Sequence, residues 1–258
     1  MTFFKDVWKI VTEHGDLLLR GVGNTLLIAV IGTLAGLLIG LLIGILRTTP
    51  FSRKKALRVL HKIADAICSV YIEVFRGTPM MVQAMVIYWG YAFASGGQTL
   101  PLIPSGIFIV SINTGAYMAE IVRGGIISID KGQFEGAQAL GMSHLQIMCH
   151  IVLPQVIRNI LPSVSNEFII NIKDTSVLNV IGVTELYFYA GKIKLFNLQI
   201  FQTYFVVCVL YFILTFSISR LLRLAERKLD GKENYTICGS QSDFNAEIHV
   251  QEESPSCR

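Results

Sequence analysis

Residues 25–46 read TLLIAVIGTLAGLLIGLLIGIL, and no side chain in this run is charged. A helix that crosses the hydrocarbon core of a bilayer needs roughly 20 mostly apolar residues. The apolar core of a secretory signal peptide has only about 7–15 residues, whereas this run is longer and begins well inside the chain. It therefore predicts a transmembrane helix that is retained.

The overall composition agrees with this reading, since 52% of the 258 residues are hydrophobic, 16% are charged and the mean hydropathy is +0.56. Such a chain is too apolar for an ordinary soluble domain. We expect an all-α, polytopic membrane protein with about five transmembrane helices, at about 22–46, 64–93, 102–124, 154–182 and 199–221.

The basic residues predict the orientation, because Lys and Arg gather in cytoplasmic loops. They follow the first and the last predicted span: Arg47, Arg53, Lys54, Lys55, Arg58 and Lys62, then Arg220, Arg223, Arg227 and Lys228. Residues 95–101 contain neither type, which suits the outside. The N-terminus is then outside and the C-terminus cytoplasmic. These clusters explain the net charge of +4 without a nucleic-acid partner.

The two ends differ from the membrane domain, which we place at 17–229. Residues 1–16 mix aromatic and aliphatic side chains with charges, a pattern that suits a helix lying in the outer membrane interface. A simple extension of the first span is the alternative. Residues 230–258 are polar and lack periodicity, so we expect a disordered cytoplasmic tail.

Small residues form a stripe along the first span, where Gly32, Gly36, Gly40 and Gly44 recur every fourth residue. Such a stripe lets a second helix approach closely in a membrane. The partner is either a helix of the same subunit or a second subunit, and the sequence leaves both open.

Residues 128–154, between the third and fourth predicted spans, contain paired helix signals. Residues 135–140 favour a short helix, Gly141 can end it in the left-handed conformation, and Ser143 can cap the next helix. The pattern predicts a compact cytoplasmic helix-turn-helix with an exposed turn.

The same loop carries a more specific pattern: Glu135, the small pair Gly136 and Ala137, Gly141, and after a gap Ile151 with residues 153–154 (LP). It resembles the signature loop of permease subunits in bacterial ATP-binding-cassette importers. Residues 113–123 (NTGAYMAEIVR) and 173–176 (KDTS) resemble the polar amino-acid branch of that family, the histidine, glutamine and arginine type. The resemblance covers about residues 17–229.

The resemblance implies a type I importer fold in the bacterial cytoplasmic membrane, with a short coupling helix that docks in a groove of an ATPase subunit. Glu135, Gly136, Ala137 and Gly141 would make that coupling. The family usually has alanine where this chain has Gly136, and glycine weakens a helix by about 1 kcal/mol relative to alanine.

The resemblance also implies several partners: two ATP-binding subunits, a second permease subunit that is identical or paralogous, and an extracytoplasmic amino-acid-binding protein. No phosphate-binding GxxxxGK motif followed by Ser or Thr occurs in the chain. ATP is therefore expected to be used by a separate subunit. We expect no catalytic residue, bound cofactor or metal here.

A candidate substrate site begins with residues 76–79 (RGTP), because Pro79 removes a backbone donor inside the second predicted span and should break the helix. A break at membrane depth is tolerated where protein buries it or where it lines a cavity. The amino end of the new half-helix suits a substrate carboxylate. A purely structural kink is the alternative.

Three polar residues of the fourth predicted span, Glu167, Asn171 and Asp174, are spaced so that they share one helix face. Acidic residues within a membrane usually face a cavity or a counter-charge, and an internal ion pair with Arg76 or Lys173 is the alternative. The resemblance implies that Thr78, Glu167, Asn171 and Asp174 contribute to an amino-acid site. Two carboxylates favour a basic amino acid.

Two alternative functions belong to other classes of protein. Intramembrane carboxylates can serve as ion sites in a secondary transporter or channel driven by an ion gradient. A membrane enzyme is disfavoured because the sequence shows neither a metal-ligand cluster nor a GxSxG nucleophile motif.

Overall fold

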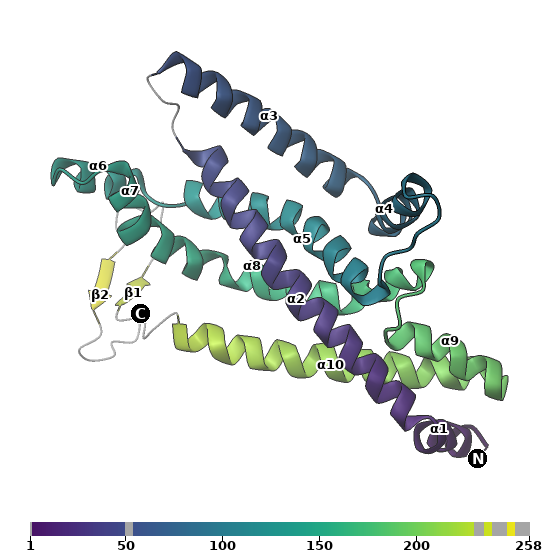
Figure 1. Ribbon diagram of the computed structural model, residues 1–258. Helices are drawn as coiled ribbons and strands as arrows, with labels where there is room; N and C mark the ends of the chain where they lie inside the picture. The colour runs from purple at the N-terminus through teal and green to yellow at the C-terminus, as the bar shows by residue number, and fades with distance from the viewer. Residues whose placement is uncertain (1, 50–53, 230–234, 239–246, 251–258) are drawn as a thin grey trace.

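The computed structural model describes residues 2–49, 54–229, 235–238 and 247–250 (Figure 1). Up to residue 229 the described chain is helical, apart from short turns. The elements are α1 (Thr2–Glu13), α2 (Gly15–Thr48), α3 (Lys55–Gly77), α4 (Met80–Ala94), α5 (Leu102–Ile127), α6 (Lys131–Ala139), α7 (His144–Ile147), a π-helix (Met148–Val152), α8 (Leu153–Asp174), a 3-10 helix (Thr175–Ile181), α9 (Leu186–Asn197), α10 (Ile200–Leu229), β1 (Tyr235–Cys238) and β2 (Glu247–Val250).

Within the described residues, four helices are long and apolar enough to cross a membrane: Gly15–Thr48, Leu102–Ile127, His144–Ile181 and Ile200–Glu226. The predicted second span is two helices, α3 and the shorter apolar α4 (Met80–Ala94). Together they return the chain from the end of the bundle that carries α6 and α7 to the opposite end, where α5 begins (Figure 1). The expectation of about five spans is therefore roughly consistent with this all-helical bundle.

The glycine stripe of α2 packs against α5 of the same chain. A Cβ added at Gly36 would lie 2.8 Å from the Cβ of Thr114, and one added at Gly40 would lie 2.7 Å from the carbonyl carbon of Met118. Gly32 and Gly44 face Val110 and Val122 in the same way. At these distances there is no room between α2 and α5 for a side chain at the four glycine positions. The stripe is therefore an intramolecular seam, which answers the question that the sequence left open.

The N-terminal helix α1 is separate from α2, since it ends at Glu13 and α2 begins at Gly15. Its Phe3 ring lies 5.6 Å from that of Phe201 and 5.3 Å from that of Phe205, both on α10. Phe4, in contrast, is 76% exposed. This two-sided helix is not an extension of the first span, and its placement in the outer interface stays a prediction.

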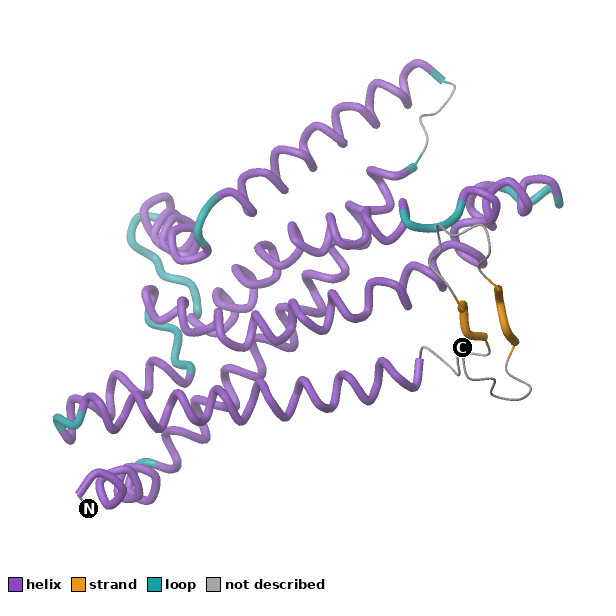
Figure 2. The backbone as a smooth tube through the Cα atoms, turned by 180° about the vertical axis from the view of Figure 1, so that it is seen from behind, coloured by secondary structure: helices purple, strands orange, loops and turns teal. Residues whose placement is uncertain are grey.

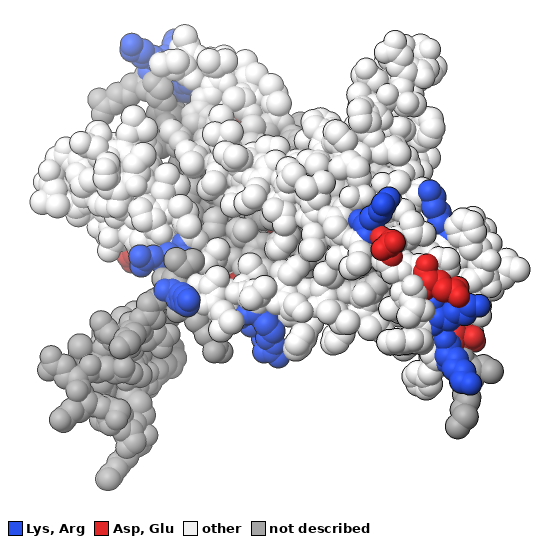
Figure 3. Space-filling model, turned by 60° about the horizontal axis from the view of Figure 1, so that its bottom comes forward, with Lys and Arg blue, Asp and Glu red and all other residues white. Residues whose placement is uncertain are grey.

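Figure 3 shows how the charged side chains are distributed on one face of the molecule. On the face drawn in Figure 3, acidic and basic side chains gather toward two ends, and an expanse of uncharged residues lies between them. This distribution suits a protein whose middle is surrounded by lipid.

In the C-terminal segment, β1 and β2 pair antiparallel, with Tyr235 opposite Val250 and Cys238 opposite Glu247. The remaining residues of the tail that we predicted to be disordered lie outside the described residues. Figure 2 shows this hairpin beside the end of the bundle that carries α6 and α7.

Candidate functional site

The helix break predicted at Pro79 is present, because α3 ends at Gly77 and α4 begins at Met80. Thr78 lies in the break, is exposed, and donates its hydroxyl to the carbonyl oxygen of Val74 at 2.7 Å. The last carbonyls of a helix have no partner within it. Thr78 thus satisfies one of them while its own backbone is extended.

Gln83, one turn into α4, holds the break in shape. Its side-chain amide donates to the carbonyl oxygens of Phe75 and Thr78, both at 2.9 Å, and approaches the Thr78 hydroxyl at 2.8 Å. Its side-chain oxygen accepts from the amide of Asn113 on α5 at 2.8 Å. The break is therefore a hydrogen-bonded corner fixed to α5. Sequence reasoning missed both residues, although a glutamine one turn after Pro79 in an apolar helix was a usable signal.

Asn171 lies at the meeting point of three helices and is only 4% exposed. Its side-chain oxygen accepts from the Thr114 hydroxyl of α5 at 3.1 Å, and its amide donates to the Thr33 hydroxyl of α2 at 2.8 Å. The three side chains tie α2, α5 and α8 together in the core. Asn171 thus occupies a packing position that the spacing from Glu167 and Asp174 did not distinguish.

Glu167 and Asp174 are half-buried on α8. In the part of the chain that the structure describes, no Lys or Arg nitrogen lies within 4.0 Å of either carboxylate, so the internal ion pair weighed from the sequence is not formed. Glu167 is within electrostatic reach of Asp174 and of Arg76 on α3. The Arg76 guanidinium itself lies over the Tyr117 ring of α5, 5.5 Å from its centre. Residues from α3, α5 and α8 therefore form one polar region.

The predicted helix-turn-helix is also present. The carboxylate of Asp130 caps α6 by accepting from the backbone of Gly132 at 2.6 Å. Gly141 ends this segment with a φ of 77°, the left-handed conformation that favours glycine. Ser143 and Gln146 form a reciprocal capping box at the start of α7. The helix starts at Lys131, earlier than the sequence signals indicated.

The four predicted coupling residues fall on two sides of this motif. Ala137 is buried and belongs to a hydrophobic cluster that includes Val122 of α5 and Val152 of the π-helix. Glu135, Gly136 and Gly141 are exposed, and next to them are Leu140, 83% exposed, and Leu145, 74% exposed. The motif is thus anchored through Ala137 and presents an acidic and apolar surface outward.

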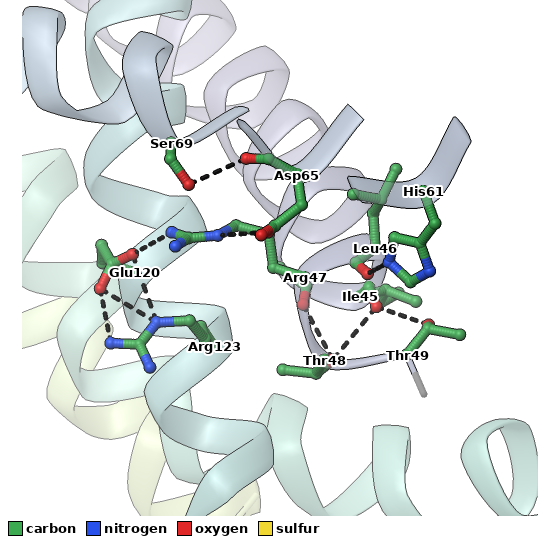
Figure 4. Close-up of polar contacts among 11 residues, drawn as sticks. Ile45, Leu46, Arg47, Thr48, Thr49, His61, Asp65, Ser69, Glu120 and Arg123 are labelled. Carbon is green, nitrogen blue, oxygen red and sulfur yellow. Dashed lines mark hydrogen bonds and ion pairs between the residues drawn. The ribbon is translucent and has the colours of Figure 1, made fainter. Parts of the chain in front are cut away.

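A charged cluster near the same end of the bundle was missed by sequence reasoning (Figure 4). Arg47 of α2 donates to Asp65 of α3 at 3.2 Å and to Glu120 of α5 at 2.7 Å. Arg123 donates to Glu120 at 2.8 Å. In the sequence, Arg47 indicates only the topology. Glu120 and Arg123, three residues apart in an apolar helix, were the available signal.

A bundle of membrane-crossing helices, a broken helix beside half-buried acids and an exposed helix-turn-helix at one end are together typical of membrane transport proteins. Comparison with known proteins makes the class specific. A family described as "Binding-protein-dependent transport system inner membrane component" matches residues 36–231. The chain belongs to this family, and the resemblance found in the sequence is confirmed.

Two curated relatives and one solved structure illustrate the similarity. The glutamine transport system permease protein GlnP of Escherichia coli (strain K12) is 38% identical over 86% of this chain and 97% of its own length. The L-cystine transport system permease protein TcyB of Bacillus subtilis (strain 168) is 40% identical over 64% of this chain and 70% of its own length. A structure described as an amino acid ABC transporter with histidines has a TM-score of 0.72 and 35% identity, over 84% of this chain and 96% of that one.

Proposed function

We propose that this chain is the membrane-spanning subunit of an ATP-driven importer that moves polar amino acids, basic ones included, across the cytoplasmic membrane by alternating access. The observation that carries the proposal is the helix-turn-helix that presents Glu135, Leu140 and Gly141 outward while Ala137 anchors it to the bundle. Relatives named as glutamine and cystine permeases support the amino-acid substrate.

The proposed partners follow from this surface. The exposed side of α6 and the turn at Gly141 dock on an ATP-binding subunit, two of which serve a pair of permease subunits, identical or paralogous. Glu135 offers a charge to a basic residue of that subunit, and Leu140 offers an apolar contact. An extracytoplasmic binding protein delivers the amino acid at the opposite end, where α1 lies, so that the N-terminus is outside and the C-terminus cytoplasmic.

The proposed substrate site lies between the helix break and α8. Thr78 and the amino end of α4 receive the α-carboxylate, since the backbone N–H groups there carry partial positive charge. Glu167 and Asp174 receive the ammonium group or a cationic side chain, because half-buried carboxylates that form no ion pair with another described residue favour a cation. Asn171 sits behind them and holds the three helices in place.

Alternating access then depends on the partner subunits. ATP-driven closure of the two ATPases moves the two docked helix-turn-helix motifs, and these movements open the site outward. Hydrolysis returns it inward. This chain binds, orients and releases the substrate, and ATP is used by its partners.

Transport by purified components tests the proposal. Vesicles that contain the permease, the ATP-binding subunit and the binding protein should accumulate labelled arginine or glutamine only when ATP is supplied to the ATPase side. Uptake that needs no ATPase subunit and follows a proton or sodium gradient would refute the proposal and favour the secondary-transporter alternative.

A further inference from the structure

Helix α3 is held less tightly in the bundle than its neighbours. Ile72 is its one buried residue within the described chain, whereas α2 and α5 pack along the glycine stripe with backbone in contact. Figures 1 and 2 both show α3 at the outside of the bundle, with its axis apart from that of α5. Its connections to the rest therefore depend strongly on a few polar side chains.

The four charged residues Arg47, Asp65, Glu120 and Arg123, here named the clasp, supply one such connection (Figure 4). The Arg47 guanidinium bridges α3 and α5, because its Nε donates to Asp65 and one of its terminal nitrogens donates to Glu120. Glu120 accepts a second, two-pronged interaction from Arg123 at 3.1 and 2.8 Å. The clasp has two positive and two negative groups, so its formal charges cancel.

The clasp is asymmetric. Movement of α3 would leave Glu120 paired with Arg123 and Arg47, because α2 and α5, which carry these residues, pack closely through the glycine stripe. The Asp65 side chain is 39% exposed, compared with 23% for Glu120 and 21% for Arg47. Release of α3 would therefore leave Arg47 paired with Glu120, which it shares with Arg123, and would leave Asp65 in contact with water. Neither group would be stranded as a buried, unpaired charge, which is the costly outcome.

The same helix connects the clasp to the proposed substrate site. Thr78 follows Asp65 by 13 residues, about 20 Å along a helix at 1.5 Å per residue. Between them the Tyr71 hydroxyl donates to the Ile112 carbonyl of α5. Asp65 near the middle of α3 and Tyr71 one to two turns later thus hold the half of the helix that leads to Arg76 and Thr78, where Gln83 and Asn113 supply the next contact with α5.

We infer that Asp65 is a positioning residue for transport: its ion pair with Arg47 closes and opens in each cycle and thereby sets the position of α3 and of the substrate groups at its far end. This inference rests on the proposed function. The alternative is a permanently closed pair that only stabilises the fold.

The first test compares Asp65→Asn with Glu73→Gln in the complete importer in vesicles. Glu73 is an exposed acid on the same helix and is outside the clasp, so its variant controls for charge loss. Asp65→Asn should raise the number of ATP molecules hydrolysed per amino acid imported by up to about fivefold, because about 1 kcal/mol, the upper end for an ion pair in contact with water, corresponds to that factor. Asp65→Glu should restore the ratio, and Glu73→Gln should leave it unchanged. An unchanged ratio in Asp65→Asn would overturn the inference.

The second test prevents opening. In a chain with its five cysteines replaced by serine, Arg47→Cys and Asp65→Cys are joined by a short bis-thiosulfonate reagent. Uptake should fall at least tenfold relative to the same double-cysteine variant without the reagent and should return on reduction, while each single cysteine variant should keep its own rate of uptake when the reagent is added. Full uptake by the cross-linked importer would show a pair that stays closed and would overturn the inference. Loss of ATP-dependent uptake in the unmodified wild type would instead refute the proposed function.

Discussion

Gly40 of α2 offers the sharpest test of the packing that organises this bundle. A Cβ built there would lie 2.7 Å from the carbonyl carbon of Met118 and 2.9 Å from the backbone nitrogen of Ala119. Carbon atoms in good contact are about 3.5–4.0 Å apart. Because these neighbours belong to the α5 backbone, no side-chain rotation relieves the contact, and α2 and α5 must separate by roughly 1 Å.

The expected cost follows from two opposing terms. Overpacking a close-packed interface costs typically 1–3 kcal/mol and occasionally more, and here the upper end applies since separation also loosens the contacts at Gly36 and Gly44. Alanine returns about 1 kcal/mol through its better helix propensity. We expect Gly40→Ala to lower the free energy of unfolding by about 2 kcal/mol.

The matched control is Gly23→Ala in the same helix, where an added Cβ meets no atom of the described residues within 4 Å. It should be neutral or stabilising by up to about 1 kcal/mol. Both variants can be measured by reversible unfolding in mixed micelles with increasing SDS. Equal stability of Gly40→Ala and wild type would refute the close packing of α2 on α5.

Three further outcomes are expected. Gly136→Ala should stabilise α6 by up to about 1 kcal/mol, since its Cβ would meet no atom of the described residues within 4 Å. It should also tighten binding of the ATPase subunit, measured by titration. Weaker binding would contradict the view that this position has room for a methyl group. Glu167→Gln and Asp174→Asn should raise the half-saturating concentration for arginine uptake more than that for glutamine with complex assembly intact, and unchanged kinetics in both would remove them from the site. Asn171→Leu should lower the free energy of unfolding by about 1–2 kcal/mol, as expected when membrane hydrogen bonds are lost. Gln83→Leu should disturb uptake through Thr78 and lower the free energy of unfolding by less. A larger loss of stability in Gln83→Leu than in Asn171→Leu would contradict the roles assigned to the two amides.

The candidate site was predictable where its chemistry is local. Pro79 breaks the helix because proline lacks a backbone N–H. Gly141 adopts the left-handed conformation and Ser143 caps a helix, and both properties depend on the residue and its immediate neighbours. These features therefore appeared in the structure at the predicted residues. The start of α6 was missed because Asp130, its cap, was outside the segment that showed helix signals.

Residues that act through distant partners were not predictable in the same way. Asn171 shares the helical spacing of Glu167 and Asp174, yet its partners Thr33 and Thr114 come from two other helices. Spacing along one helix defines a shared face and leaves open which neighbour covers each part of it. The clasp was missed for the same reason, since Arg47, Asp65 and Glu120 lie on three helices.

The sequence alone determined that the chain lies in a lipid bilayer and indicated the number of membrane-spanning helices to within one. It also determined the helix break at Pro79 and the family-specific loop. These depend on hydropathy, on proline and glycine backbone chemistry, and on short-range spacing. Only the tertiary structure decided that the glycine stripe faces α5, that Asn171 is a core residue and that Asp65 joins a clasp. Close packing determines these contacts, because which surfaces meet depends on the shape of the whole bundle.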